Sequence, residues 1–99
     1  MKNRSRYEVI AAILASCIRS ETRTKIMYKA MLSNDQCKLY IQLLLNCGLI
    51  TEVLYREKKY YTITENGNRF LYNFEKLKEM LPTILEGESE GQHKIAMEI

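Results

Sequence analysis

The start of one helix is marked more sharply than any other element of this 99-residue chain. Ser33 and Gln36 have the spacing of a capping box, in which each side chain accepts a hydrogen bond from the backbone N–H of the other residue. Leu32, just before this box, is a candidate for the apolar residue that often fixes the entry to such a helix. Gly48 can adopt the left-handed conformation that ends a helix. We therefore expect a helix over residues 33–47.

Two amphipathic helices are predicted before it, over residues 5–18 and 23–31, with about three residues between the second and the third. The apolar stripes that predict them are formed by Tyr7, Ile10, Ala11, Leu14, Cys17 and Ile18, and by Ile26, Met27, Ala30 and Met31. In the third helix the inward positions are Cys37, Tyr40, Ile41, Leu44 and Leu45, and the outward positions are Asp35, Lys38, Leu39, Gln42 and Asn46. Each of the three helices therefore has one face suited to a shared core.

A β-hairpin and a last helix are expected after Gly48. Residues 50–55 and 59–63 are rich in β-branched and aromatic side chains, and the charged residues 56–58 separate them. Thr64 can cap a helix that continues to about residue 86, and Pro82 is expected to bend or fray its end. Helix, short helix, capped helix and hairpin is the order of a winged helix-turn-helix. The predicted fold class is mainly α with a small β-hairpin, a winged helix-turn-helix with a long C-terminal dimerisation helix.

The last helix has the apolar spacing of a coiled-coil seam. Its seam residues, spaced 4, 3, 4 and 3 apart, are Phe70, Phe74, Leu77, Leu81 and Ile84. A helix over residues 65–86 is about 33 Å long and would project past a three-helix body. We therefore expect a DNA-binding domain over residues 1–64, a dimerisation helix over 65–86, a tail over 87–99, and a homodimer. The alternative is that the seam folds back on the first helix of the same subunit.

Positive charge is concentrated in the first part of the chain. Residues 1–60 contain eleven Lys and Arg against five acids, whereas residues 61–99 contain four against seven. Phosphate attraction falls off within a screening length, so this distribution suits a polyanionic partner on one side, and double-stranded DNA is the partner we expect. The alternative is a basic surface that is merely solvated.

The sequence contains no pattern typical of a catalytic or metal-binding site. Cys17, Cys37 and Cys47 have neither metal-ligand nor disulfide-framework spacing, and they are expected to be small buried apolar residues in a reducing compartment. His93, the only histidine, lies in the tail, and there is no glycine-rich phosphate loop. We expect no enzyme activity, cofactor, metal or evident small-molecule ligand. With no signal peptide or membrane span, the expected location is cytoplasmic and nucleoid-associated.

Three strings resemble a known family: RSRYEVIAAIL, TRTKIMYKAMLSNDQCKLYIQLLLNCGLI and KYYTITENGNRFL. Over about residues 4–75 the chain is similar to archaeal winged-helix proteins, the ArnR-type regulators and the 10a-type chromatin-associated DNA binders. The resemblance implies a recognition helix over residues 33–46, a wing at residues 56–59 and an antiparallel pairing of two subunits through the last helix. One departure is Leu39, because relatives often have a basic residue at this position after Lys38.

The candidate DNA-binding residues follow from this arrangement. Asn34 and Gln36 could bind adenine edges, although Gln36 is also the capping residue, and Ser33 could bind a phosphate or serve only as the cap. Lys38 and Gln42 lie one turn apart on the polar face. The remaining candidates are Arg23 and Lys25 on the second helix and Arg56, Lys58 and Lys59 on the wing, where lysine could also serve solubility alone.

The predicted function is sequence-preferring binding of double-stranded DNA, as a transcriptional regulator that acts by occupying sites as a homodimer. Two alternatives stay open from the sequence. One is a winged-helix adaptor that binds proteins and not DNA, and the other is a non-specific architectural protein of chromatin.

Overall fold

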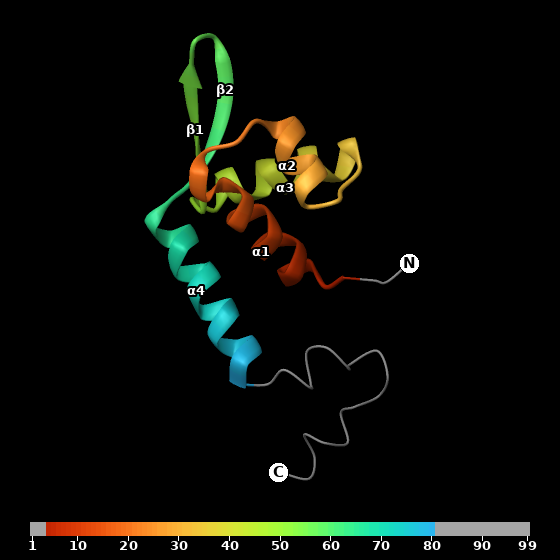
Figure 1. The fold of residues 1–99 in the computed structure, drawn as a ribbon, viewed down its shortest axis with the longest axis vertical. Helices are drawn as coiled ribbons and strands as arrows, with labels where there is room; N and C mark the ends of the chain where they lie inside the picture. Colours follow the sequence, from red (N-terminus) through yellow and green to blue (C-terminus); the bar gives the residue numbers. More distant parts are fainter. Residues whose placement is uncertain (1–3, 81–99) are drawn as a thin grey trace.

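The computed structural model describes residues 4–80 of the chain. In chain order the elements are α1 (Arg6–Ser16), the short 3-10 helix η1 (Cys17–Arg19), α2 (Arg23–Lys29), α3 (Asn34–Asn46), β1 (Ile50–Tyr55), β2 (Lys58–Ile63) and α4 (Glu65–Met80). The β1–β2 hairpin projects at one end of the molecule, and α4 extends toward the opposite end (Figure 1). This order confirms the predicted winged helix-turn-helix fold.

Side-chain caps set the starts of the helices. The Ser33 and Gln36 capping box is present as predicted, with both of its hydrogen bonds at 3.1 Å. A second capping box, formed by Ser5 and Glu8, starts α1. Thr64 starts α4, because its Oγ1 accepts a hydrogen bond from the N–H of Gly67 at 3.0 Å. Each cap satisfies a backbone N–H that has no partner within its helix.

The core lies between α1, α2, α3 and the base of the hairpin. Its largest fully buried side chains, each less than 2% exposed, are Ile13, Leu14, Ile26, Leu44, Cys17 and Cys37. The hairpin joins this body through Tyr61, whose backbone exchanges two hydrogen bonds with Glu21, of 2.8 and 3.0 Å. Lys29 also forms a 3.0 Å ion pair with Glu21. The wing base is therefore fixed to the segment that connects α1 and α2.

Several predicted details of the first two helices are wrong. The first helix gives way to the 3-10 helix η1 at Cys17, so Ile18 leaves the predicted apolar stripe and is exposed. Tyr7 is also exposed, whereas Ile13 is completely buried, because α1 is covered on a wider face than the sequence stripe suggested. The second helix ends at Lys29, and Met31 has a φ of 57° and points out of the core.

Two more corrections concern residue 47 and the hairpin turn. Cys47 is exposed because it is the residue at which α3 ends, so the expectation that all three cysteines are buried fails there. The strands are joined by two residues rather than three, and Lys58 already belongs to β2. Arg56 and Glu57 have φ values of 52° and 64°, the backbone that a two-residue hairpin turn requires.

Candidate nucleic-acid interface

The exposed face of α3 is the centre of the candidate site. Cys37, Ile41 and Leu44 hold the opposite face of this helix in the core. The connection after Lys29 runs directly into the Ser33 cap, so α2 and α3 form a helix-turn-helix. The packing that anchors α3 therefore leaves its other side free for a partner. The residues predicted to face outward are all exposed, namely Asp35, Lys38, Leu39, Gln42 and Asn46, and Leu43, which the prediction did not include, is exposed as well.

The first turn of α3 is engaged in holding the helix itself. The Gln36 side-chain oxygen accepts a hydrogen bond from the Ser33 N–H, and the Ser33 hydroxyl accepts one from the Gln36 N–H. Both residues are exposed, yet their oxygens are occupied by the cap. The capping role, which the sequence left as an alternative for both, is the one seen in the structure. Asn34 is exposed beside them at the first helical position.

Lys38 and Gln42 lie one turn apart on one flank of the exposed face. Both are exposed, and the Gln42 side-chain amide donates a 3.1 Å hydrogen bond to Asn46. This bond orients the Gln42 amide along the helix surface. The arrangement offers hydrogen-bonding groups of the kind that bind base edges in the major groove.

The wing tip is basic and exposed. Arg56, Lys58 and Lys59 are exposed, and the Arg56 guanidinium lies over the ring of Tyr55 at 5.2 Å from its centroid. Lys59 has an acid nearby, since its Nζ is 4.0 Å from a carboxylate oxygen of Glu52 across the hairpin. Exposed ion pairs of this kind are weak, so Lys59 remains able to exchange its carboxylate partner for a phosphate.

Basic residues also lie outside α3 and the wing. Arg23 and Lys25 are exposed in the first turn of α2, as a DNA-contacting role requires. Arg4 has a structural role, because its guanidinium donates hydrogen bonds to the backbone oxygens of Ala30 at 2.6 Å and Met31 at 3.2 Å. It thereby ties the N-terminal segment to the turn between α2 and α3.

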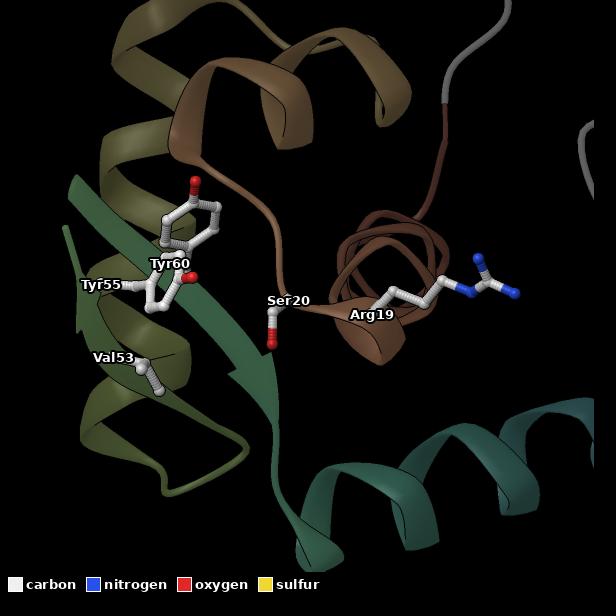
Figure 2. A pocket seen from close by; sticks show the side chains of 5 residues that line it. All are labelled: Arg19, Ser20, Val53, Tyr55 and Tyr60. Carbon is white, nitrogen blue, oxygen red and sulfur yellow. The ribbon is translucent and has the colours of Figure 1, made fainter.

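Sequence reasoning did not identify a hollow at the base of the wing. This hollow has a volume of about 400 Å³ and is lined by Arg19, Ser20, Val53, Tyr55 and Tyr60. Figure 2 shows the Tyr55 and Tyr60 side chains together, with the Arg19 side chain directed away from them. The two rings meet edge to face with centroids 6.3 Å apart. No sequence motif links these residues, because the pairing of β1 with β2 and the position of η1 bring them together.

The residues of the predicted dimer seam lie in two different environments along α4. Phe70 and Leu71 are partly buried against the core of their own subunit, and the Phe70 ring lies 6.5 Å from that of Tyr7 in α1. At Phe70 the seam therefore packs against the first helix of the same subunit, which is the alternative that the sequence left open. Further along, Leu77 is 45% exposed, and Phe74 is half-buried with Lys78 over its ring. Leu81 and Ile84 lie outside the described residues, as do Pro82 and the tail.

Residues 4–80 contain no cluster of three or more His, Cys, Asp or Glu side chains that could bind a metal ion. The pKa of the Cys17 thiol is raised from 9.0 to about 12, chiefly by burial, with smaller contributions from Glu21 and Cys37. Burial also raises the pKa of the Cys37 thiol. Both thiols therefore stay protonated at neutral pH, unlike reactive cysteines, whose pKa is lowered.

Among residues 4–80 no helix is both long and apolar enough to cross a membrane.

The sequence matches the family model described as winged helix-turn-helix over residues 3–82. No curated protein matches the sequence.

Among solved structures, Sso10a-2, a DNA-binding protein from Sulfolobus solfataricus, is 27% identical with a TM-score of 0.69, over 88% of this chain and 95% of that one. MepR, a transcription regulator of the Staphylococcus aureus multidrug efflux pump MepA, is 16% identical with a TM-score of 0.65, over 96% and 76%. F93 from STIV, a winged-helix DNA-binding protein, is 14% identical with a TM-score of 0.62, over 78% and 90%. The last two show likeness of fold alone.

These comparisons confirm the resemblance stated from the sequence. The match to Sso10a-2 agrees with the predicted similarity to 10a-type proteins. The winged helix is a fold of non-enzymatic regulators, in agreement with the prediction that the chain is not an enzyme. The family model covers most of the chain, from before α1 through all of α4. The chain belongs to the winged helix-turn-helix family.

Proposed function

We propose that this protein binds double-stranded DNA with α3 in the major groove and regulates transcription by occupying its sites as a homodimer. The observation that carries the proposal is the exposed side of α3: Lys38 and Gln42 lie on its outward face and Asn34 is exposed in its first turn, while the opposite face anchors the helix in the core. A helix held in this way can enter the major groove without losing its own support. The likeness to Sso10a-2, a DNA-binding protein, supports the same proposal.

The proposal divides the contacts between two parts of the surface. Asn34, Lys38 and Gln42 are assigned to base edges, and the oxygens of Ser33 and Gln36 remain in the cap. The exposed bases Arg23, Lys25, Arg56, Lys58 and Lys59 are assigned to the DNA backbone. Phosphate contacts fix the position of a protein on the duplex but carry no direct sequence information, whereas base-edge contacts do.

The dimer is assigned to the part of α4 beyond Leu71. Phe74, Leu77 and Met80 present apolar surface there, and Met80 is 73% exposed. A second copy of the same helix would cover this surface, and Leu81 and Ile84 would continue the seam. Two recognition helices related by a two-fold axis would favour inverted-repeat sites.

The test of DNA binding is a selection from a pool of random duplexes at low salt. Enrichment of one motif, arranged as an inverted repeat, is the expected result. No binding to any duplex in the pool would contradict the proposal, and binding without enrichment would indicate the architectural alternative.

The division of contacts is tested with two variants on the selected site and on an unrelated duplex. Lys58→Ala combined with Lys59→Ala is expected to weaken binding to both duplexes equally. Gln42→Ala is expected to cost about 1–3 kcal/mol on the selected site and little on the other. Equal loss of specificity in both variants would refute the division.

The dimer is tested by sedimentation of Phe74→Glu combined with Leu77→Glu. Charge placed on the seam is expected to produce monomers with weaker DNA binding. The control is Tyr72→Glu, because Tyr72 is an exposed aromatic residue about 160° around the same helix from Phe74. A double variant that stays dimeric would show that α4 does not form the interface.

A further inference from the structure

The centre of the outward face of α3 is apolar. Leu39 is 72% exposed, and Leu43, one turn later, is 39% exposed. At about 100° per residue, Leu39 lies about 160° around the helix from both Cys37 and Ile41. Those two residues are buried, so Leu39 points as directly away from the core as a residue on this helix can. Lys38 and Gln42 lie to one side of it.

The outward face of α3 has little charge around this apolar centre. Asp35 and Lys38 are the only charged residues of α3, so the helix is neutral as a whole. Leu39 is too exposed to contribute much to the core of its own subunit, and Leu43 remains 39% exposed beside it. If α3 enters the major groove, its central contact is therefore made by methyl groups rather than by a cation.

The major groove exposes one apolar group among its hydrogen-bonding edges, which is the C5-methyl group of thymine. Leu39 and Leu43 are separated by about 6 Å along the helix axis, at 1.5 Å per residue. Bases on one strand are about 3.4 Å apart, so the two side chains can reach positions about two steps apart on one strand. The spacing of the leucines thus fits thymines that are close neighbours.

We propose that Leu39, assisted by Leu43, recognises thymine methyl groups, so that the preferred duplex is one with thymines at the centre of each half-site. This inference rests on the proposed function and specifies the DNA that α3 selects. Lys38 and Gln42 then bind the polar edges of the flanking base pairs. Burial of a methyl group between Leu39 and thymine supplies the discrimination at the centre.

The experiment compares an A·T-rich inverted-repeat duplex with the same duplex containing deoxyuridine in place of every thymidine. The substitution removes only the methyl groups and keeps every hydrogen-bonding group. The wild-type protein is expected to bind the uracil duplex about fourfold more weakly per contacted methyl group, from about 0.8 kcal/mol for each buried carbon. Affinities are measured for both duplexes by fluorescence anisotropy in the same buffer.

Two variants complete a double-mutant cycle with the DNA methyl groups. Leu39→Ala is expected to bind the two duplexes equally well. Its affinity for both should equal the affinity of the wild-type protein for the uracil duplex. Leu54→Ala is the matched control, because Leu54 is 70% exposed but lies on the wing, where backbone contacts are expected. This control is expected to keep the full preference for thymine. Since Leu39 and Leu54 are both exposed, neither change should disturb folding, and circular dichroism of both variants checks this.

The outcomes separate the two proposals. Equal wild-type affinity for both duplexes would overturn the assignment of Leu39 while leaving DNA binding intact. A thymine preference that survives in Leu39→Ala would also overturn it, because the preference would then come from the shape of the duplex or from another residue. No binding to either duplex at low salt would overturn the proposed function itself.

Discussion

Gly67→Ala is expected to destabilise the protein even though alanine is the better helix former. Gly67 lies in the first turn of α4, where the chain leaves the wing, and it is buried. A Cβ atom at this position would overlap the backbone oxygen of Leu49 and lie 2.6 Å from Cγ1 of Ile63. The Leu49 oxygen cannot move away freely, because it accepts a 3.0 Å hydrogen bond from the N–H of Thr64.

The net effect can be worked from three contributions. Greater helix propensity contributes up to about 1 kcal/mol of stability. Overpacking against atoms that cannot yield costs about 1–3 kcal/mol, and loss of the Thr64 hydrogen bond costs about 1 kcal/mol more. We therefore expect the free energy of unfolding to fall by about 1–3 kcal/mol. In urea this loss lowers the midpoint by about 1 M, because small proteins lose about 1–3 kcal/mol of stability per molar urea.

Urea titration followed by far-ultraviolet circular dichroism measures this change at one fixed protein concentration, since dimerisation would make stability concentration-dependent. The control is Asn68→Ala, one residue later on the exposed side of the same helix, which is expected to gain a few tenths of a kcal/mol from propensity alone. Gly67→Ala with a midpoint equal to or above that of the wild type would refute the described contact between α4 and Leu49.

Three further predictions concern the cysteines and the wing turn. In the native protein a thiol reagent is expected to label Cys47 rapidly and to leave Cys17 and Cys37 unreacted until denaturant is added, and rapid labelling of all three would contradict their burial. Because the folded state holds the Cys17 proton up to a pKa of about 12 and the unfolded chain releases it near 9.0, stability is intact below pH 9.0. The free energy of unfolding should then fall by about 1.4 kcal/mol per pH unit as the pH rises from 9.0 toward 12. The measurement is the urea midpoint at each pH. If the midpoint of Cys17→Ala falls as steeply as that of the wild type, the loss of stability has another origin than Cys17. Glu57→Gly is expected to raise the melting temperature, since Glu57 has a φ of 64° and glycine relieves a left-handed backbone cost of about 1 kcal/mol; an unchanged or lower value would contradict the turn geometry.

Elements with local chemical signals were predictable from the sequence. The Ser33 capping box, the end of α3 before Gly48 and the two strands depend on residues close in the chain, and each is present. The hairpin turn was harder, because Arg56 and Glu57 lack the Asn-Gly or Asp-Gly signal typical of two-residue turns. There the pairing of the strands imposes the backbone conformation.

Burial was less predictable where tertiary packing decides it. An apolar stripe assumes that one face of α1 is covered, but this helix is packed on more than one side, so Val9 and Ile13 are buried as well. The exposure of Cys47 follows from its place at the helix end rather than from its residue type.

The α3 residues that helical spacing predicted to face outward are all exposed, but Leu43, which the prediction did not include, is exposed as well. The roles of the α3 side chains depend on hydrogen bonds that spacing cannot show. Gln36 bonds within the cap, whereas Gln42 bonds to Asn46. The central position of Leu39 on the exposed face also needed the structure, because the burial of Cys37, Ile41 and Leu44 defines which side of α3 faces the core. The assignment of individual residues to DNA stays a prediction.

The salt dependence of DNA binding tests the central claim most directly. If each subunit places about three or four of its exposed bases on phosphates, the logarithm of affinity should fall against the logarithm of salt concentration with a slope of about −3 per subunit. A dimer on one site should show about twice that slope. Steep weakening with salt on a random-sequence duplex is the result we predict. Binding that is absent at low salt, or insensitive to salt, would contradict the account and favour a protein-binding adaptor.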